Sequence, residues 1–138
     1  MKQMITTNVA LDTNILIYSH DTADLYKQNI ARDLILKCPI VSAQVVSEYI
    51  NVLRRMMVIP KNKLLNLCAK TLENTRICPI NIIVIRNAEY IIQRYDLQLF
   101  DSIIAASSIE AGCEILYSED MQHNLVIEQK LKIINPFI

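Results

Sequence analysis

The sequence predicts an α/β protein in which helices cover both faces of a central parallel sheet of four to five strands. Short apolar runs alternate with segments of helical periodicity along the chain, which is typical of parallel α/β folds. The first run, Val9–Leu11, is continuously apolar rather than alternating, as expected for a strand buried on both faces. These observations indicate three layers, with helices on either side of the sheet.

Capping residues place the elements in the first half of the chain. Asn14 is expected to cap a short helix, because asparagine side chains accept hydrogen bonds from the first free amides of a helix. Ser42 caps a longer helix whose apolar positions recur at spacings of three and four up to about Met56. The expected elements are a strand at 9–11, helices at 15–18 and 25–38, a strand at 40–41 and a helix at 43–56.

The second half continues the alternation. Pro60 separates two helices, Asn81 can cap another, and Gly112 is expected to end the last one, since glycine adopts the left-handed conformation common at helix C-termini. The expected elements are a helix at 61–75, a strand at 77–80, helices at 82–95 and 100–111, and strands at 114–117 and 131–134, with a polar loop before the last strand.

Length and composition indicate one domain over residues 1–138. The chain is 52% hydrophobic and 20% charged and has a single glycine, so it can form one core and has little linker material. No apolar stretch reaches the roughly 18 residues of a membrane span. The start, Met1-Lys2-Gln3, lacks the features of a signal peptide. We therefore expect a cytoplasmic protein with no membrane partner.

Charge, cysteine and glycine content exclude several classes of function. The 14 basic and 14 acidic residues balance, so any nucleic acid would be held through a local patch and metal ions. The four cysteines include no close pair, which argues against zinc sites and disulfides. One glycine leaves no phosphate-binding glycine loop. His20 and His123 are too few and too separated to serve as the acid–base pair of a metal-free ribonuclease.

Two carboxylates follow apolar strands. Asp12 comes directly after Val9–Leu11, and Asp120 lies just beyond the strand at 114–117, where its neighbour Glu119 is interpreted as facing solvent. In parallel sheets the carboxyl ends of the strands form the edge at which ligands bind. We therefore expect both aspartates at that edge, although Asp120 also fits a residue that merely starts a turn.

Glu48 and Asp101 lie on helices that we expect to reach the same edge. Glu48 lies between Val45 and Val52 inside the apolar stripe of its helix, where an unpaired carboxylate is costly. A metal ligand fits this position better than the alternative, a salt bridge to a distant basic residue. Asp101 stands in a first helical turn, which the helix dipole alone favours. Small apolar residues after it indicate close packing on the sheet, which would direct Asp101 to the end of the sheet.

Four converging carboxylates predict a metal site. Clustered carboxylates repel one another and raise each other's pKa unless a cation lies between them. Oxygen-only sites favour hard cations such as Mg²⁺ or Mn²⁺. These ions activate water and stabilise the leaving oxygen of a phosphodiester. The sequence therefore predicts metal-dependent hydrolysis at this edge of the sheet.

Five segments, taken together and in this order, resemble the motifs of PIN-domain nucleases, and specifically the VapC-type toxins of toxin–antitoxin systems. The segments are 11–14 (LDTN), 47–48 (SE), 100–107 (FDSIIAAS), 116–122 (LYSEDMQ) and 135–137 (NPF). The resemblance covers nearly the whole chain. It implies a three-layer α/β/α PIN-like fold, endonucleolytic cleavage of RNA with Mg²⁺ or Mn²⁺, a cognate antitoxin and a homodimer.

The resemblance also assigns roles to individual residues. It implies that Asp12, Glu48 and Asp101 hold the principal ion and that Asp120 completes or orients the site. Asn14 and Ser118 match positions that support the acidic pocket through hydrogen bonds. Family members commonly carry glycine where this chain has Asn124, and asparagine also tolerates positive φ.

A basic group in the middle of the chain offers candidates for contacts to the phosphates of RNA. Such a group is also compatible with a simple solvated face. Its members are Arg54, Arg55, Lys61 and Lys63.

Two further classes stay open from the sequence. A PIN-fold module could bind RNA or an antitoxin without cleavage, although the intact acids argue against it. A receiver-like signalling domain would carry two adjacent acids after the first strand and a lysine after the last. Here Thr13 follows Asp12, and the last strand ends Ile133-Ile134-Asn135.

Overall fold

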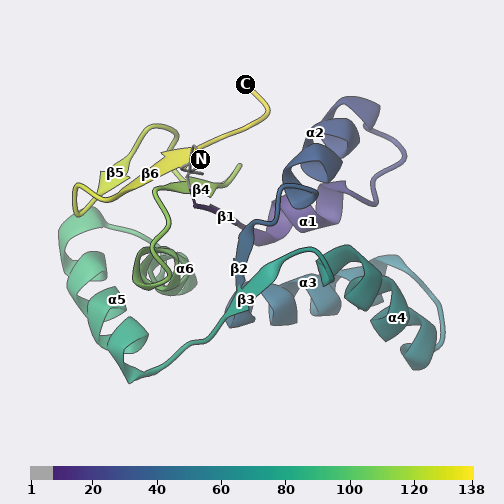
Figure 1. The fold of residues 1–138 in the computed structure, drawn as a ribbon, viewed down its shortest axis with the longest axis horizontal. Helices are drawn as coiled ribbons and strands as arrows, with labels where there is room; N and C mark the ends of the chain where they lie inside the picture. The colour runs from purple at the N-terminus through teal and green to yellow at the C-terminus, as the bar shows by residue number, and fades with distance from the viewer. Residues whose placement is uncertain (1–7) are drawn as a thin grey trace, which may run out of the picture.

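The structure is a computed structural model that describes residues 8–138 (Figure 1). Expectations about Met1-Lys2-Gln3 and the start of the domain lie outside these residues. The strands are β1 (Val9–Leu11), β2 (Ile40–Ser42), β3 (Arg76–Cys78), β4 (Ile115–Tyr117), β5 (Val126–Ile127) and β6 (Leu131–Ile134). The helices are α1 (Thr13–Tyr18), α2 (Leu25–Ile35), α3 (Ala43–Met56), α4 (Lys61–Leu72), α5 (Ile82–Tyr95) and α6 (Leu99–Glu110).

The strands form one mostly parallel sheet in the order β3-β2-β1-β4-β6-β5. β1 lies between β2 and β4, and its register pairs Leu11 with Tyr117. The residues that follow these two strands therefore emerge side by side at one edge. The predicted α/β class and parallel sheet are confirmed.

The sheet has six strands in the described residues, and not the four to five that were expected. The strand that was not predicted is β5. This two-residue strand pairs antiparallel with β6. Glu128 and Gln129 join the two strands with φ of 53° and 57°, and the amide of Lys130 donates to the carbonyl of Ile127 at 3.0 Å. Asparagine and glycine are the usual residues of such a turn. Glu128 and Gln129 gave no turn signal, so the hairpin was interpreted as a polar loop.

Helices cover both sides of the sheet. Figure 1 shows α5 and α6 packed together on one side, with α1 and α2 on the opposite side. Ile104, Ala105 and Ala106 of α6 are buried, as the small apolar residues after Asp101 predicted. Close packing of these short side chains holds the first turn of α6 against the sheet.

Most predicted caps are confirmed. Ser42 accepts from the amide of Val45 at 3.1 Å, and Asn81 accepts from that of Val84 at 3.0 Å. Gly112 has φ of 81° directly after the end of α6, and Asn124 adopts the expected positive φ of 70°.

The cap of α1 was predicted wrongly. Asp12, not Asn14, is the N-cap residue, and its carboxylate accepts from the amide of Thr13. Asparagine and aspartate are equally good caps, so the sequence did not distinguish them.

Two helices end three residues earlier than predicted, at Ile35 and Leu72. Met56, placed in the buried stripe of α3, is 52% exposed because it lies in the last turn. None of the helices in residues 8–138 has the length and apolar character needed to cross a membrane.

Candidate active site

All four predicted carboxylates line one cavity of about 250 Å³. The cavity opens where β1 and β4 end, beside the first turn of α6 and the face of α3 that runs from Glu48 to Arg55. Its walls consist of four acidic and two amide side chains together with one threonine, one valine and one arginine. The lining residues are Asp12, Thr13, Asn14, Glu48, Asn51, Val52, Arg55, Asp101 and Asp120.

Asp12 is fixed by both of its carboxylate oxygens. Oδ1 accepts from the amide of Thr13 at 2.7 Å, which makes Asp12 the N-cap of α1. Oδ2 accepts from the hydroxyl of Ser118 at 2.7 Å. Asp12 is only 6% exposed and Ser118 is fully buried. The predicted support from Ser118 therefore has a direct geometric basis.

Glu48 lies half-buried on α3 and faces the cavity. The hydroxyl of Thr13 donates to its Oε2 at 2.6 Å, and the amide of Gln44 donates to its Oε1 at 2.9 Å. Gln44 also donates to the carbonyl oxygen of Phe100 at 3.2 Å and so links α3 to α6. Among residues 8–138 Glu48 forms no ion pair, so the alternative of a salt bridge is not what holds it.

Asp101 and Asp120 complete the acidic wall. Asp101 lies in the first turn of α6 and is partly buried. Asp120 is exposed and accepts a hydrogen bond from the side-chain amide of Asn14. Asn14, placed wrongly as a cap, thus makes the supporting contact that the family resemblance implied.

Two of the four carboxylates have raised pKa values. Burial is the largest cause that raises the pKa of Asp12, to about 6, and the charges of Asp101 and Glu48 add to it, against the hydrogen bonds from Ser118 and Thr13. Burial, followed by the charges of Asp120 and Glu48, also raises the pKa of Asp101. Asp12 and Asp101 therefore hold their protons more strongly than free aspartates do.

The oxygen-only donor set of this cavity fits Mg²⁺ or Mn²⁺ in its chemistry. Within residues 8–138, however, no three Asp, Glu, His or Cys side chains are gathered tightly enough to hold one ion as they are placed. Uncompensated carboxylates repel, and Asp12 and Glu48 are satisfied by separate donors. An ion would have to draw the acids toward a common point.

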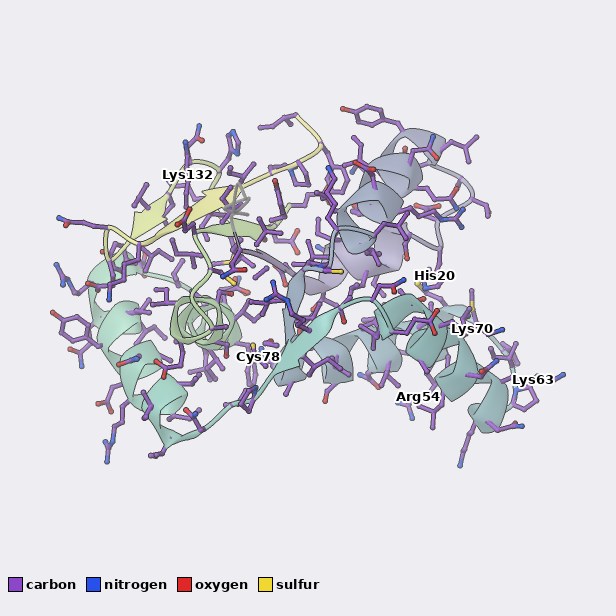
Figure 2. All side chains as sticks on the ribbon, viewed as in Figure 1. His20, Arg54, Lys63, Lys70, Cys78 and Lys132 are labelled. Carbon is purple, nitrogen blue, oxygen red and sulfur yellow. The ribbon has the colours of Figure 1, made fainter. Side chains whose placement is uncertain are left out.

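The structure separates the four basic candidates. Arg55 lines the cavity, whereas its neighbour Arg54 donates to Asn51 at 2.7 Å and is exposed. Lys61 and Lys63, in the first turn of α4, are exposed and outside the cavity lining. Figure 2 shows Arg54 and Lys63 extending away from the sheet. Only Arg55 therefore adjoins the carboxylates.

Sequence reasoning missed Thr13 and Gln44 as supports of Glu48. A signal was present for Gln44, because it precedes Glu48 by four residues and so lies on the same helix face. For Thr13 there was none, since its contact to Glu48 joins residues 35 apart in the chain.

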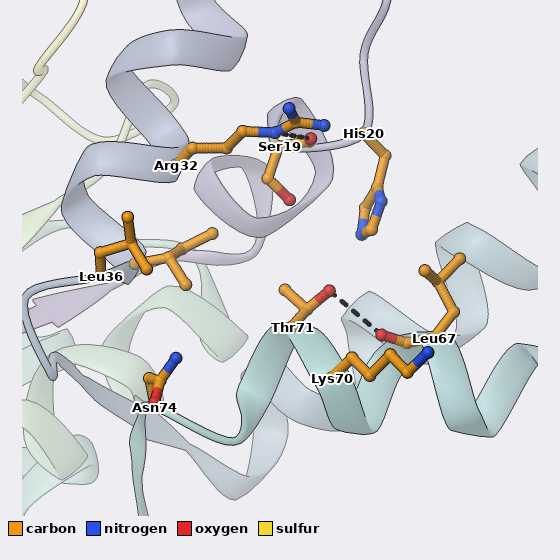
Figure 3. Close-up of a pocket in the computed structure, with 9 residues that line it drawn as sticks. Ser19, His20, Arg32, Leu36, Leu67, Lys70, Thr71 and Asn74 are labelled. Carbon is orange, nitrogen blue, oxygen red and sulfur yellow. Dashed lines mark hydrogen bonds between the residues drawn. The ribbon is translucent and has the colours of Figure 1, made fainter.

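A second cavity, of about 360 Å³, lies between the ends of α1, α2 and α4 (Figure 3). His20, Arg32 and Lys70 line it, and no carboxylate does. Arg32 donates to the carbonyl of Ser19 at 3.0 Å, and both Arg32 and Lys70 stand in last helical turns, where cations are favoured. Because this larger cavity has no carboxylate in its lining, it is not the candidate active site.

The two histidines have structural contacts. The His20 ring stacks on Tyr49 and hydrogen-bonds its hydroxyl at 2.6 Å. His123 accepts from the amide of Asn135 at 2.9 Å. Neither lines the acidic cavity, as expected for structural histidines.

Fold and site together define an α/β protein with an acidic cavity at the carboxyl edge of a mostly parallel sheet. A comparison with sequence models of protein families matches residues 9–126 to the PIN domain. The chain belongs to the PIN domain family. The alternative interpretation as a receiver-like signalling domain is therefore wrong.

Solved structures share the fold. A toxin–antitoxin complex from Klebsiella pneumoniae has a TM-score of 0.68 at 19% identity, covering 94% of this chain and 98% of that one. FitAcB from Neisseria gonorrhoeae has a TM-score of 0.68 at 18% identity, with the same coverage. VapC20 from Mycobacterium tuberculosis, a sarcin-ricin loop cleaving toxin, has a TM-score of 0.64 at 18% identity, covering 82% and 90%. A search of curated protein sequences finds no match.

Proposed function

We propose that this chain is a cytoplasmic endoribonuclease that depends on Mg²⁺ or Mn²⁺ and serves as the toxin of a toxin–antitoxin pair. The observation that carries the proposal is the cavity in which Asp12, Glu48, Asp101 and Asp120 face one another on a PIN-domain fold. Burial and neighbouring negative charges raise the pKa of Asp12 and of Asp101, and a bound cation would offset both effects.

In this proposal Asp12, Glu48 and Asp101 hold the principal ion and Asp120 completes the site. When bound, Mg²⁺ or Mn²⁺ supplies a Lewis acid that activates water and offsets the charge of the scissile phosphate. Ser118 orients Asp12 through its hydrogen bond. The chain itself thus contributes pre-oriented acceptors.

Three other residues act beside the carboxylates. Thr13 holds Glu48, and Asn14 holds Asp120. Arg55, at the wall of the cavity, contacts a phosphate of the substrate. The exposed Arg54, Lys61 and Lys63 lie on its flank and add less specific attraction for RNA.

Similar solved structures support the substrate class and the protein partner. One neighbour is named as a toxin that cleaves the sarcin-ricin loop, an RNA element, and another is a toxin–antitoxin complex. We therefore propose RNA as substrate and a cognate antitoxin as partner.

A second copy of the chain is the other proposed partner. Large apolar side chains are exposed along α5 and the start of α6, and burying them in a homodimer would remove them from water. They are Ile82, Ile83, Ile85, Leu99 and Phe100. Sedimentation velocity of the wild type and of Ile82→Asp tests this; the variant should shift the population from dimer to monomer.

The main test is cleavage of a mixture of structured RNAs by the purified protein with Mg²⁺ or Mn²⁺. EDTA, Asp12→Asn and Asp101→Asn should each reduce cleavage by more than about 100-fold, since even indirect supports of a metal are worth about 10–100-fold. Asp33→Asn is the matched control, because Asp33 is an exposed acid of α2 that pairs with Lys37 just beyond the helix. Equal cleavage by wild type and Asp12→Asn would contradict the proposal.

A non-catalytic binding module is the second candidate function. The observation that favours it is the spacing of the acids, no three of which are gathered around one point in residues 8–138. This candidate predicts no cleavage under any divalent metal and no measurable binding of Mn²⁺ by the folded protein. Calorimetric titration with Mn²⁺ therefore separates the two candidates without an RNA substrate.

A further inference from the structure

The sequence indicated that Glu119 faces solvent, and this interpretation was wrong. Its carboxylate is held by two other side chains. The ammonium group of Lys27 on α2 pairs with its Oε2 at 2.6 Å. The hydroxyl of Tyr18, at the end of α1, donates to its Oε1. We refer to Tyr18, Lys27 and Glu119 as the Glu119 cluster. It joins the turn after β4 to α1 and α2.

Aromatic rings support the cation of this cluster. The Lys27 ammonium lies 4.6 Å from the centroid of the Tyr18 ring and 5.3 Å from that of Phe137. The two rings meet edge to face at 5.1 Å. Cation–π attraction and partial burial restrict Lys27 more than an ordinary surface lysine. Burial alone would raise the pKa of Glu119, but hydrogen bonds from Lys27 and Tyr18 outweigh it and lower that pKa.

The residues on either side of Glu119 point the other way. Ser118 donates to Asp12, and Asp120 accepts from Asn14 at the wall of the acidic cavity. Three consecutive side chains of one turn are thus fixed to three different groups. Asp120 is the exposed member, and within residues 8–138 its side chain forms a hydrogen bond only with Asn14.

We infer that Glu119 is a positioning residue of the proposed metal site. Held by Lys27 and Tyr18, it sets the direction of the turn so that Asp120 enters the cavity instead of sampling solvent. The inference rests on the proposed function, because it assigns Asp120 to the set that binds the ion. Neither Lys27 nor Glu119 lines the cavity, so these residues would influence metal binding from outside it.

The test is calorimetric titration of the purified full chain with Mn²⁺, which needs no RNA. Glu119→Ala should raise the Kd for Mn²⁺ by about 10-fold, in the range observed for residues that orient a metal ligand. Its thermal midpoint should fall by about 5 °C or less, because the Lys27–Glu119 pair is partly exposed. Lys37→Met is the matched control: it removes the exposed Lys37–Asp33 pair at the C-terminal end of the same helix.

A double-mutant cycle separates positioning from a general structural role. If Glu119 acts through Asp120, Glu119→Ala should not weaken Mn²⁺ binding further in an Asp120→Asn background. Additive losses would overturn the inference.

Lys27 variants provide an independent route if Glu119→Ala does not fold. Lys27→Met should weaken Mn²⁺ binding, and Lys27→Arg should restore it, because arginine keeps the charge and the stacking on the rings. Unchanged Mn²⁺ affinity in Glu119→Ala or Lys27→Met would overturn the inference while leaving the proposed function intact. Failure of the wild type to bind Mn²⁺ would instead overturn the proposed function.

Discussion

The hydroxyl of Ser118 donates to Oδ2 of Asp12 at 2.7 Å, and both residues are buried at the ends of adjacent strands. The register of β1 and β4 pairs Leu11 with Tyr117, and the amide of Asp12 donates to the carbonyl of Tyr117 at 2.9 Å. Strand pairing alone therefore brings the acid and its hydroxyl partner together. The central carboxylate of the cavity is placed by the backbone of the sheet, not by a mobile loop.

Asp12→Asn is expected to stabilise the metal-free protein at neutral pH. Burial raises the pKa of Asp12 from 3.8 to about 6, so the folded state binds this proton more tightly than the unfolded state. The ionised form therefore destabilises the fold, by about 3 kcal/mol. Asparagine carries no charge and still accepts from the amide of Thr13.

The stabilisation by Asp12→Asn should depend on pH, because only the ionised form of Asp12 is unfavourable in the folded state. The difference in free energy of unfolding between Asp12→Asn and wild type should be small near pH 4, grow as the pH rises to about 6 and then stay constant. Urea unfolding in EDTA from pH 4 to 8 measures it, and other titrating groups cancel in the difference. A difference that does not change with pH would contradict the raised pKa.

Three of the four acids were predictable because each violates or ends a local pattern. Asp12 and Asp120 follow apolar strands, and Glu48 interrupts an apolar helix stripe. An unpaired acid inside an apolar stripe is costly, and an acid directly after a buried strand lies at the edge of the sheet where ligands bind, so one sequence suffices to select these positions. Asp101 has no such signal, since first-turn acids are common, and it was chosen for the small residues after it.

Contacts between distant segments were not predictable. Nothing in the local sequence places Thr13 against Glu48, or Lys27 of α2 against Glu119 after β4. The same limit applies to the grouping of Arg54 and Arg55, since only their position on α3 relative to the cavity distinguishes them. Periodicity identifies elements and their buried faces, whereas these contacts depend on how the elements are arranged.

Divalent metal should stabilise the wild-type fold. An ion that binds the folded state at about 100 times its Kd adds about 2.7 kcal/mol, which corresponds to a rise in thermal midpoint on the order of 5–10 °C. Asp101→Asn should abolish most of the rise, whereas Asp33→Asn should preserve it. Differential scanning fluorimetry with Mn²⁺ and with EDTA measures the shift. An equal shift in Asp101→Asn would remove Asp101 from the metal set.

Ser118→Ala should move metal binding to higher pH. The Ser118 hydrogen bond lowers the pKa of Asp12, so its loss leaves burial and the neighbouring charges to raise that pKa further. Because protons compete with the ion, the pH midpoint for Mn²⁺ binding should rise relative to wild type. Ser108→Ala, which removes a buried intrahelical bond to Ile104, should not shift this midpoint. Both variants should lose about 1–3 kcal/mol of stability, so the midpoint, and not the stability, distinguishes them.

Arg55 and Arg54 offer a matched pair for the RNA contact. They are adjacent on α3 and chemically identical, but only Arg55 lines the acidic cavity, while Arg54 is bonded to Asn51. Arg55→Ala should raise the KM for RNA by about 10-fold and reduce the salt slope of RNA binding by about one, as expected for one lost phosphate contact. Arg54→Ala should change both quantities less.

Neither arginine substitution should weaken Mn²⁺ binding, because the loss of a nearby positive charge cannot make an acidic site less attractive to a cation. Mn²⁺ titration beside the RNA measurements therefore separates a substrate contact from damage to the metal site. If the two arginine variants lose RNA affinity equally, the basic residues act as a diffuse positive face, and the cavity wall gives Arg55 no special contact with the phosphate.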